Sequence, residues 1–502
     1  MTLAPFRAEI GAINDLLCAA SVLVWDSRTM MPAGGAETRG LQIATLTRAA
    51  RDRLLGDAMA RALDAARRAV ESLPQDHPDA RAVAQTEAAV AHHARVPADL
   101  IEARAALRTR AQAAWTQARA TSDFALFAPH LEETMRLARD YADAVGWEAH
   151  RYDAMVGMFE PGETAASLSA LFATLRAGIA PLLDGARGRA PARDDFLARG
   201  YAMEGQRAFG LSIAERFGYD LSHGRLDTTV HPFEVSFTRN DVRITTRYRP
   251  DYLPGSLFGI FHETGHALYE QNVEPAYTRS ALTTDLVGLY GVGGTSFGAH
   301  ESQSRLWENH VARTPTFWAN HFPALQAQFP EELADVDADA FYAAVTRAEP
   351  GFIRVEADEL TYDLHIMLRV ELETALMAGD LAVADLPGAW DALVRRDLGL
   401  VVPDARRGVL QDVHWSSGYI GSFPTYTIGN VMAAQLMEAV REDDPGAIDA
   451  LERADYAPLA DWLRAAVWRH GRRFSRDELL VQATGRGLDP APYLRHLAVK
   501  YG

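Results

Sequence analysis

Cysteine is almost absent from this sequence: Cys18 is the only one among 502 residues. A single cysteine cannot form an intramolecular disulfide, and a chain of this size without disulfides fits a reducing compartment. Cys18 lies in the apolar stretch LLCAASVLVW, where we expect a small buried side chain. The first residues lack a basic stretch followed by an apolar run, so we expect no signal peptide and a cytoplasmic protein.

Positive charge is also scarce, with 50 basic against 67 acidic residues and a formal net charge of −17. This balance argues against a protein that follows the phosphates of a nucleic acid or adheres to anionic lipid. Long apolar runs are missing as well, and we expect no segment that approaches the roughly 20 residues needed to span a bilayer. The sequence therefore predicts neither a nucleic-acid partner nor a membrane.

Linkers, internal repeats and low-complexity tracts are not found either. What is present is a sequence rich in Ala, Leu, Arg and Glu, with apolar residues recurring every three or four positions, as in residues 106–145. This periodicity is typical of amphipathic helices. We therefore expect a mainly α protein that forms one large domain over residues 1–502.

One segment departs from the helical pattern. Residues 233–252 are rich in β-branched and aromatic side chains, and Arg239, Asn240 and Asp241 form a turn signal between two such runs. We predict a β-hairpin or a small three-stranded sheet here. A helix should follow, because Pro254-Gly255-Ser256 is a plausible helix start.

That helix contains the sequence His-Glu-Thr-Gly-His. Residues four apart on a helix lie on one face, so His262 and His266 could present two imidazole nitrogens to one metal ion. Glu263 would sit beside the ion and could take a proton from water. The alternative is the polar face of an ordinary helix, since the pattern arises by chance in about a few per cent of such chains. Apolar flanks favour the metal, because buried imidazoles and a carboxylate need a partner.

Catalytic zinc takes three protein ligands, so the two histidines need a third. The segment 299–312 offers His300, Glu301 and Glu308. We favour Glu301, because a carboxylate completes the two-histidine, one-glutamate set of zinc peptidases. The alternative is an ordinary helical pair between Glu301 and Arg305, four residues on, and spacing alone does not decide between them.

A glycine-rich segment, GLYGVGGTSFG at residues 288–298, lies between the predicted His-Glu-Thr-Gly-His helix and the segment 299–312. It is not a phosphate-binding loop, because no strand precedes it and no Gly-Lys-Ser/Thr follows. A flexible loop at the rim of the site is the simpler interpretation.

Unusual polar residues concentrate in three further segments, at 231–248, 353–373 and 408–430. Each segment also has an ordinary structural interpretation, because strand arginines are usually solvated, helix carboxylates usually cap or pair, and aromatic loops usually pack. The residues of interest are His231, Arg243, Arg247, Arg354, Gln411, His414 and Tyr426.

Together with His-Glu-Thr-Gly-His, these segments resemble the carboxypeptidase Taq family of zinc metallocarboxypeptidases, and the resemblance runs nearly end to end. The motifs occur in the family's order: His231-Pro232-Phe233; Asp241, Arg243 and Thr245; His262 to His266; His300-Glu301-Ser302-Gln303; Ile353-Arg354 with Ala357-Asp358; and Gly408, Gln411, Asp412, His414 and Trp415.

This resemblance implies a mainly helical fold with a small sheet beside a deep groove. Residues 1–225 would form a groove wall, and residues 226–502 would carry the zinc site. It also implies Glu301 as the third ligand, one zinc ion per chain with cobalt as a substitute, and a homodimer. Two departures stand out: an insertion between His266 and Glu301, and Ser422 where the family usually has tyrosine.

The expected activity is release of single C-terminal residues, with broad specificity, from peptides that carry a free C-terminal carboxylate. The family's Ile-Arg motif makes Arg354 the first choice for binding that carboxylate, because a planar guanidinium grips a carboxylate with two hydrogen bonds. Arg243 and Arg247 are alternates. His231 and Gln411 are further expected substrate contacts.

In the expected mechanism, zinc lowers the pKa of its water from about 15.7 toward about 7, and Glu263 takes the proton. His414 or Tyr426 would donate to the developing oxyanion, and the sequence does not choose between them. One rival is a helical zinc endopeptidase or dipeptidase with the same ligands. The other is a non-catalytic scaffold with a degenerate site, against which the intact Glu263 argues.

Overall fold

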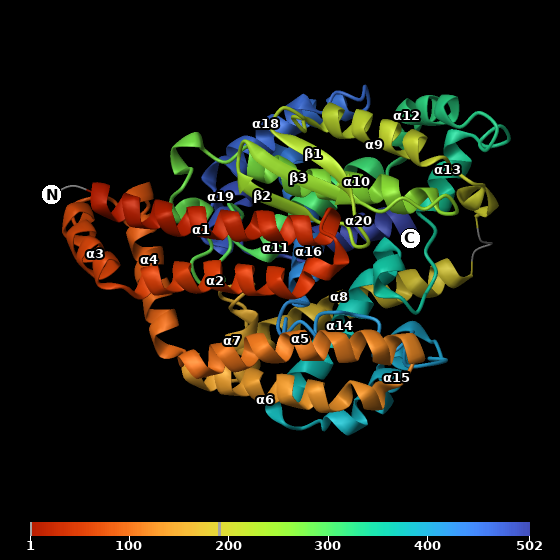
Figure 1. Cartoon of the computed structure of the whole chain (residues 1–502). Coiled ribbons are helices and arrows are strands. Elements are labelled where there is room, and N and C mark those ends of the chain that lie inside the picture. The colour runs from red at the N-terminus through yellow and green to blue at the C-terminus, as the bar shows by residue number, and fades with distance from the viewer. Residues whose placement is uncertain (1–2, 189–191) are drawn as a thin grey trace. The chain divides into compact units, whose positions relative to one another are not determined.

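The computed structural model describes residues 3–188 and 192–502, and these residues form helices with one small sheet (Figure 1). The expected mainly α class is confirmed. The predicted sheet is present too, although its first strand lies upstream of the segment in which we expected it.

The chain divides into two compact units, and neither is continuous in sequence. Unit 1 comprises Met1–His93, Pro191–Thr346 and Met432–Asp489, and unit 2 comprises Ala94–Ala190, Arg347–Val431 and Pro490–Gly502. Both units therefore draw on both sides of residue 225, the division expected from the family resemblance. Whether the two units act as one catalytic domain stays a prediction.

Unit 1 holds the sheet and helices from three separate parts of the chain. Its helices are α1 (Ala4–Thr29), α2 (Ala36–Leu55), α3 (Asp57–Val70), α9 (Met203–Phe217), α10 (Leu253–Gln271), α11 (Phe297–Arg305), α12 (Pro315–Gln328), α13 (Ala338–Val345), α17 (Pro445–Leu451), α18 (Ala457–Ala466) and α19 (Arg476–Thr484). Helix α4 (Pro78–Arg95) belongs to this unit up to His93.

Unit 2 is built from helices alone among the residues that the structure describes. They are α5 (Ala98–Thr121), α6 (Ala128–Val145), α7 (Arg151–Val156), α8 (Ala165–Arg187), α14 (Glu359–Ala378), α15 (Leu386–Leu398) and α20 (Ala491–Tyr501). Helix α16 (Pro424–Asp443) begins in this unit and continues past its boundary at Val431. Helices α5 and α6 pack side by side (Figure 1).

The sheet has three strands in the order β1-β3-β2. Strand β3 (Asp241–Thr246) pairs in parallel with β1 (Gly224–Thr228) and antiparallel with β2 (Glu234–Thr238), across the turn at residues 239–240 that the sequence predicted. We missed β1, because its sequence Gly-Arg-Leu-Asp-Thr has little β-branched character. Strands β2 and β3 pack against α10 (Figure 1).

Helix α10 is the most deeply buried long helix of unit 1. It begins at Leu253 with Pro254 in its first turn, where a proline costs no hydrogen bond. Its apolar side packs on an aromatic cluster in which the Phe217 ring contacts those of Phe261, Trp307 and Phe317. This packing fixes the helix that carries the two candidate ligands.

Two helices, α1 and α8, are long and apolar enough to cross a membrane by length and composition. This corrects our expectation that no segment approaches that length. The criterion is weak, because the core helix of a soluble protein also meets it. Phe6, Ile10, Ile13 and Leu17 are buried on α1, and 39% of its apolar window is buried in all. The absence of a membrane partner stays a prediction.

Candidate metal centre

Three side chains of unit 1 converge as the sequence predicted. His262 and His266 extend from α10, and Glu301 extends from α11. Oε2 of Glu301 lies 3.7 Å from Nε2 of His262 and 3.5 Å from Nε2 of His266. All three ligand atoms lie within 4.8 Å of one another.

This spacing fits a small tetrahedral ion. Ligands about 2.0–2.1 Å from such an ion lie roughly 3.3 Å apart, close to the separations observed. Two imidazoles and one carboxylate form a donor set that zinc accepts, and three protein ligands leave a fourth position open. The residues present therefore fit the metal that the sequence predicted.

The two interpretations of Glu301 hold at once. Its Oε1 accepts a hydrogen bond from Arg305 Nε at 2.7 Å, which is the helical pair we considered as the alternative. Its Oε2 faces the histidines. Burial raises the pKa of Glu301, but Arg305 and the two imidazoles outweigh burial and hold the pKa well below its usual range. Arg305 thus keeps the carboxylate ionised, as a metal ligand must be.

A close approach of two helices brings Glu301 within reach. A Cβ atom on Gly265 would lie 2.4 Å from the Gln303 carbonyl oxygen and 2.6 Å from Cα of Ser304. Both contacts are to the backbone of α11, which cannot rotate away as a side chain can. The glycine inside His-Glu-Thr-Gly-His therefore lets α10 and α11 lie against each other.

His262 is oriented by a second glutamate. Its Nδ1 lies 2.9 Å from Oε2 of Glu308, which leaves Nε2 for the metal. Glu308 lies in a π-helical segment, Leu306–Ala312, that continues α11. Burial raises the pKa of Glu308, but His262, Arg305 and Arg313 lower it to about 2. Glu308 is thus a carboxylate that fixes which nitrogen of His262 is free.

His266 is oriented differently, through another histidine. Its Nδ1 lies 2.5 Å from Nδ1 of His300, and Nε2 of His300 lies 2.9 Å from Oε1 of Glu270. Burial raises the pKa of Glu270, but His300 and the backbone amides of Gly293 and Gly294 bring it below its ordinary value. Burial lowers the pKa of His266 to about 3, so the ring is neutral and ready to ligate.

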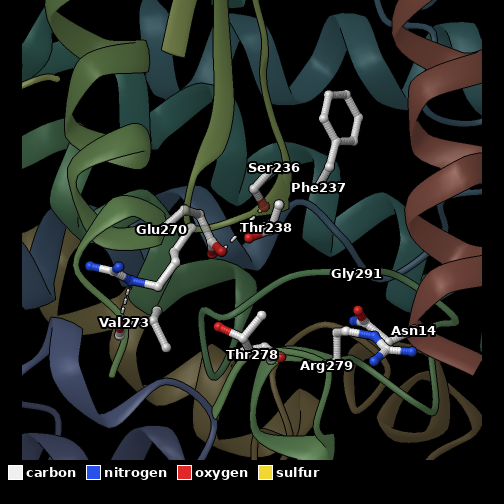
Figure 2. Close-up of a pocket in the computed structure, with 11 residues that line it drawn as sticks. Asn14, Ser236, Phe237, Thr238, Glu270, Val273, Thr278, Arg279 and Gly291 are labelled. Atoms are coloured by element: carbon white, nitrogen blue, oxygen red, sulfur yellow. Dashed lines mark hydrogen bonds between the residues drawn. The ribbon is translucent and has the colours of Figure 1, made fainter. Parts of the chain in front are cut away.

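The glycine-rich loop forms a wall of this arrangement. The amides of Gly293 and Gly294 donate to Glu270 over 2.9–3.0 Å. Ser236 of β2 donates to the same carboxylate at 3.2 Å, and Figure 2 shows the two side chains meeting at the edge of a small pocket. We expected the loop only at the rim of the site. The structure makes it a direct support for Glu270.

Glu263 is buried beside the ligands, with only 6% of its surface exposed. Burial raises its pKa to about 7, against the opposing effect of His262. Glu234 lies near it on β2, and burial together with Glu270 and Glu263 raises the pKa of Glu234 well above its usual value. Glu263 is therefore a carboxylate whose affinity for a proton is raised by its surroundings, as a general base requires.

Arg354 lies in unit 2, in a 3₁₀ turn just before α14. Its Nε donates to Asp412 at 2.9 Å, and its Nη1 donates to the Tyr362 hydroxyl at 2.9 Å. The buried Arg369 donates to the other oxygen of Asp412 at 2.7 Å. Two buried guanidinium groups thus share one carboxylate, which leaves a net positive charge suited to an anion.

The other expected contacts of unit 2 gather around Arg354. Gln411 accepts a hydrogen bond from the backbone amide of Arg354 and donates to the Phe352 carbonyl, so it holds the turn. Nε2 of His414 lies 3.0 Å from the Tyr426 hydroxyl. Burial, together with Arg354, lowers the pKa of His414 to about 3, so the ring is neutral. The structure joins His414 and Tyr426 without choosing between them.

The three expected residues of the 231–248 segment belong to unit 1, whereas Arg354 belongs to unit 2. Arg243 on β3 pairs with Asp241 through two bonds of 2.8 Å and lies over the Trp25 ring. Arg247 and His231 are exposed. Arg243 is therefore paired and half-buried, and not solvated as our structural alternative expected. A substrate role for any of the three stays a prediction.

The supporting residues Glu270, Asp412 and Arg369 were not assigned these roles from the sequence. A signal for Glu270 existed, because His262, His266 and Glu270 recur at four-residue intervals on one face of a helix. Glu308 similarly follows Glu301 by seven residues, about two turns. Nothing local in the sequence indicated that Arg369 would meet Asp412.

Comparison with known proteins agrees with these motifs. The chain matches the family described as carboxypeptidase Taq (M32) metallopeptidase over residues 6–501. It is 38% identical over 510 residues to thermostable carboxypeptidase 1 of Thermus thermophilus, covering 99% of this chain and 97% of that protein. It is 36% identical to carboxypeptidase 1 of Bacillus subtilis, covering 96% of this chain and 94% of that protein.

Solved structures give the same result. The crystal structure of the M32 carboxypeptidase from Deinococcus radiodurans R1 matches with a TM-score of 0.93 at 40% identity, covering 99% of this chain and 98% of that one. The structure of Pyrococcus furiosus carboxypeptidase matches with a TM-score of 0.94 at 31% identity, covering 100% of this chain and 99% of that one.

Proposed function

This chain belongs to the carboxypeptidase Taq (M32) metallopeptidase family and is a metallocarboxypeptidase, and from that premise we propose a zinc enzyme that removes single residues from peptide C-termini. The single observation that supports zinc is the convergence of His262, His266 and Glu301 at distances a small tetrahedral ion requires. When bound, the ion supplies a Lewis acid that activates water and polarises the scissile carbonyl.

The protein's own part in the reaction centres on Glu263. As the general base, its carboxylate takes a proton from the attacking water and passes it to the nitrogen of the leaving amine. Its burial beside the ligands supports this role, because the raised pKa makes the carboxylate a better proton acceptor. Glu308 and Arg305 have supporting roles, since they orient His262 and keep Glu301 ionised.

Arg354 is proposed to bind the C-terminal carboxylate of the peptide substrate. The net positive charge of the Arg354, Arg369 and Asp412 cluster supports it, because a buried cationic cluster favours an anionic ligand. His414 or Tyr426 is proposed as donor to the oxyanion. Broad specificity for the C-terminal residue belongs to the same proposal.

Matched peptides test the function directly. The metal-loaded enzyme is incubated with peptides that differ only in a free or amidated C-terminus, with and without a chelator, and products are identified by mass. We expect stepwise loss of single residues from the free form only, abolished by the chelator. Equal cleavage of both forms would indicate an endopeptidase, and no cleavage of either would indicate a scaffold.

The same assay tests Arg354. Replacing Arg354 by alanine should raise KM for free-carboxylate peptides and leave the zinc content near that of the wild type, because the residue is proposed to bind substrate and not metal. Arg247→Ala serves as the comparison, since Arg247 is an exposed alternate. An Arg354→Ala enzyme with unchanged KM, beside an Arg247→Ala enzyme with a raised one, would transfer the role to Arg247.

The remaining expectations are part of the proposal. We propose a cytoplasmic homodimer that acts on peptides with a free C-terminal carboxylate, binds neither nucleic acid nor membrane, and accepts cobalt in place of zinc. Sedimentation of the purified enzyme tests the dimer, and activity after cobalt is added to the metal-free enzyme tests the substitution.

A further inference from the structure

We infer that His300 and Glu270 form a positioning relay that holds the ligating nitrogen of His266 on the metal, and that Gly293 and Gly294 anchor this relay. The inference rests on the proposed metal site. It concerns a different question: how the second histidine of the motif is kept in a single orientation.

The hydrogen bonds of the relay have only one consistent direction. A neutral His266 that binds metal through Nε2 keeps its proton on Nδ1, so Nδ1 donates to Nδ1 of His300. His300 then accepts on Nδ1 and carries its own proton on Nε2, which donates to Oε1 of Glu270. Each ring has one donor and one acceptor atom, so the carboxylate at the far end determines the tautomers of both.

The rings themselves leave His300 little freedom. Its ring stacks on His266 with centroids 4.6 Å apart and on Tyr269 with centroids 5.6 Å apart. Its side chain is 13% exposed. His300 is therefore fixed by stacking as well as by its two hydrogen bonds.

The glycine pair anchors the far end of the relay. Three hydrogen bonds of 2.9–3.0 Å run from the amides of Gly293 and Gly294 to Glu270. A Cβ on Gly294 would lie 2.4 Å from Cδ2 of His300, and a Cβ on Gly293 would lie 2.8 Å from Val273. Glycine at these two positions allows the backbone to approach both the carboxylate and the ring.

The two histidines of the motif are thus supported in different ways. His262 contacts a carboxylate directly, through Glu308, while His266 reaches one only through a second imidazole. Loss of a group that orients a metal ligand typically weakens metal binding about 10- to 100-fold. His300 should matter to the same extent, although it is not itself a ligand.

Zinc affinity of the metal-free protein, measured by competition with a chromophoric chelator, tests the relay without reference to activity. His300→Leu keeps much of the volume but offers no acceptor, and we expect about 10- to 100-fold weaker zinc binding. His300→Asn places an amide near the position of Nδ1 and should recover part of the loss. Glu270→Gln, which removes the charge at the far end, should also weaken binding.

A buried histidine outside the relay provides the control. His321 of unit 1 is 5% exposed and bonds to the Tyr456 hydroxyl at 2.7 Å. His321→Leu should lower the melting temperature while zinc affinity stays as in the wild type. The visible absorption of bound cobalt adds a second measurement, and we expect its bands to shift in His300→Leu and not in His321→Leu.

Several outcomes would overturn the inference. One is wild-type zinc affinity in His300→Leu, and another is equally weak binding in His300→Asn and His300→Leu. If His300→Leu does not fold, His300→Asn and Glu270→Gln decide the question, because both retain polar side chains of similar size. His262→Ala separates this inference from the metal site itself. Wild-type zinc affinity in His262→Ala would contradict the metal site. Weak zinc binding in His262→Ala together with wild-type zinc affinity in His300→Leu would contradict only the relay.

Discussion

At the scale of single residues, neighbouring side chains set the charge of each functional group. Burial raises the pKa of Glu263 to about 7, while Arg305 and the imidazoles hold the pKa of Glu301 well below its usual range. One glutamate is thereby suited to accept a proton and the other to bind a cation. Both residues are glutamates, so the difference between their pKa values arises entirely from their surroundings.

Replacing Glu263 by glutamine separates the base from the ligands. Glutamine has nearly the same shape but cannot accept the proton, so we expect kcat to fall by a factor of at least about 100. Zinc content should stay near one ion per chain, because Glu263 is not proposed as a ligand. Metal analysis and steady-state kinetics on the same sample check both points. Turnover near the wild-type rate would assign the base elsewhere.

Replacing Asp412 by asparagine tests the buried charge cluster of unit 2. It leaves the guanidinium groups of Arg354 and Arg369 without their shared carboxylate, so we expect a loss of about 3–5 kcal/mol in the free energy of unfolding. Denaturant titration measures it. Asp404→Asn is the control, since Asp404 pairs with Arg407 at an exposed site, and it should change stability little.

The effect of Asp412→Asn should depend on pH in a definite direction. The two arginines hold the pKa of Asp412 far below its ordinary value of 3.8, against the effect of burial. An acid whose folded pKa is depressed adds stability above its unfolded pKa and loses it as the pH falls toward the folded one. The difference between wild type and variant should therefore be constant above about pH 5 and shrink below 3.8. A difference that grows on acidification contradicts this assignment.

At the scale of elements, the site depends on how closely α10 and α11 pack. Helix α10 supplies two candidate ligands by its own periodicity, but the third candidate, on α11, comes close only because Gly265 permits contact between the two backbones. The π-helical segment that follows α11 carries Glu308 to His262. Segments of π-helix occur often at functional sites, and this one places an orienting carboxylate.

Gly265→Ala tests this packing. The added methyl group meets the α11 backbone, so the helices must separate, and we expect a loss of about 1–3 kcal/mol in stability together with weaker zinc binding. Gly40→Ala in α2 is the matched control, because nothing lies within 4 Å of its Cβ position and alanine favours helix. Denaturant titration and zinc competition measure both variants. Unchanged zinc affinity in Gly265→Ala would show that Glu301 does not depend on this contact.

At the scale of the whole molecule, the expected functions are divided between two units. The candidate ligands and base belong to unit 1, while Arg354, Gln411, His414 and Tyr426 belong to unit 2. Each unit is assembled from segments far apart in the sequence. The proposed activity therefore draws on residues from both units, although each set is organised by contacts within its own unit.

Metal removal should lower the local stability of unit 1 more than that of unit 2. A metal that binds only the folded state stabilises it by about 2.7 kcal/mol at a free concentration 100 times its dissociation constant. Hydrogen exchange with and without zinc should show protection of α10 and α11, with little change in α5 and α6 of unit 2. The His262→Ala protein should show no zinc response. Equal protection of both units would contradict a site confined to unit 1.

The sequence by itself predicted the helical class, the two candidate histidine ligands and the candidate base, because these depend on local periodicity within one helix. It also offered Glu301 among three candidates, and the motif order identified the family. The spacing left open whether Glu301 faced Arg305 or a metal, and the tertiary structure turns one oxygen toward Arg305 and the other toward the two histidines.

Only the tertiary structure decided the supporting contacts. The relay joins α10 to a loop more than twenty residues away, and Asp412 joins arginines 58 and 43 residues before it in the chain. Such contacts depend on how elements pack, and no local pattern of side chains encodes them. The sequence therefore indicated which groups are proposed to carry the chemistry, while packing specified what holds each group in place and in which state of charge.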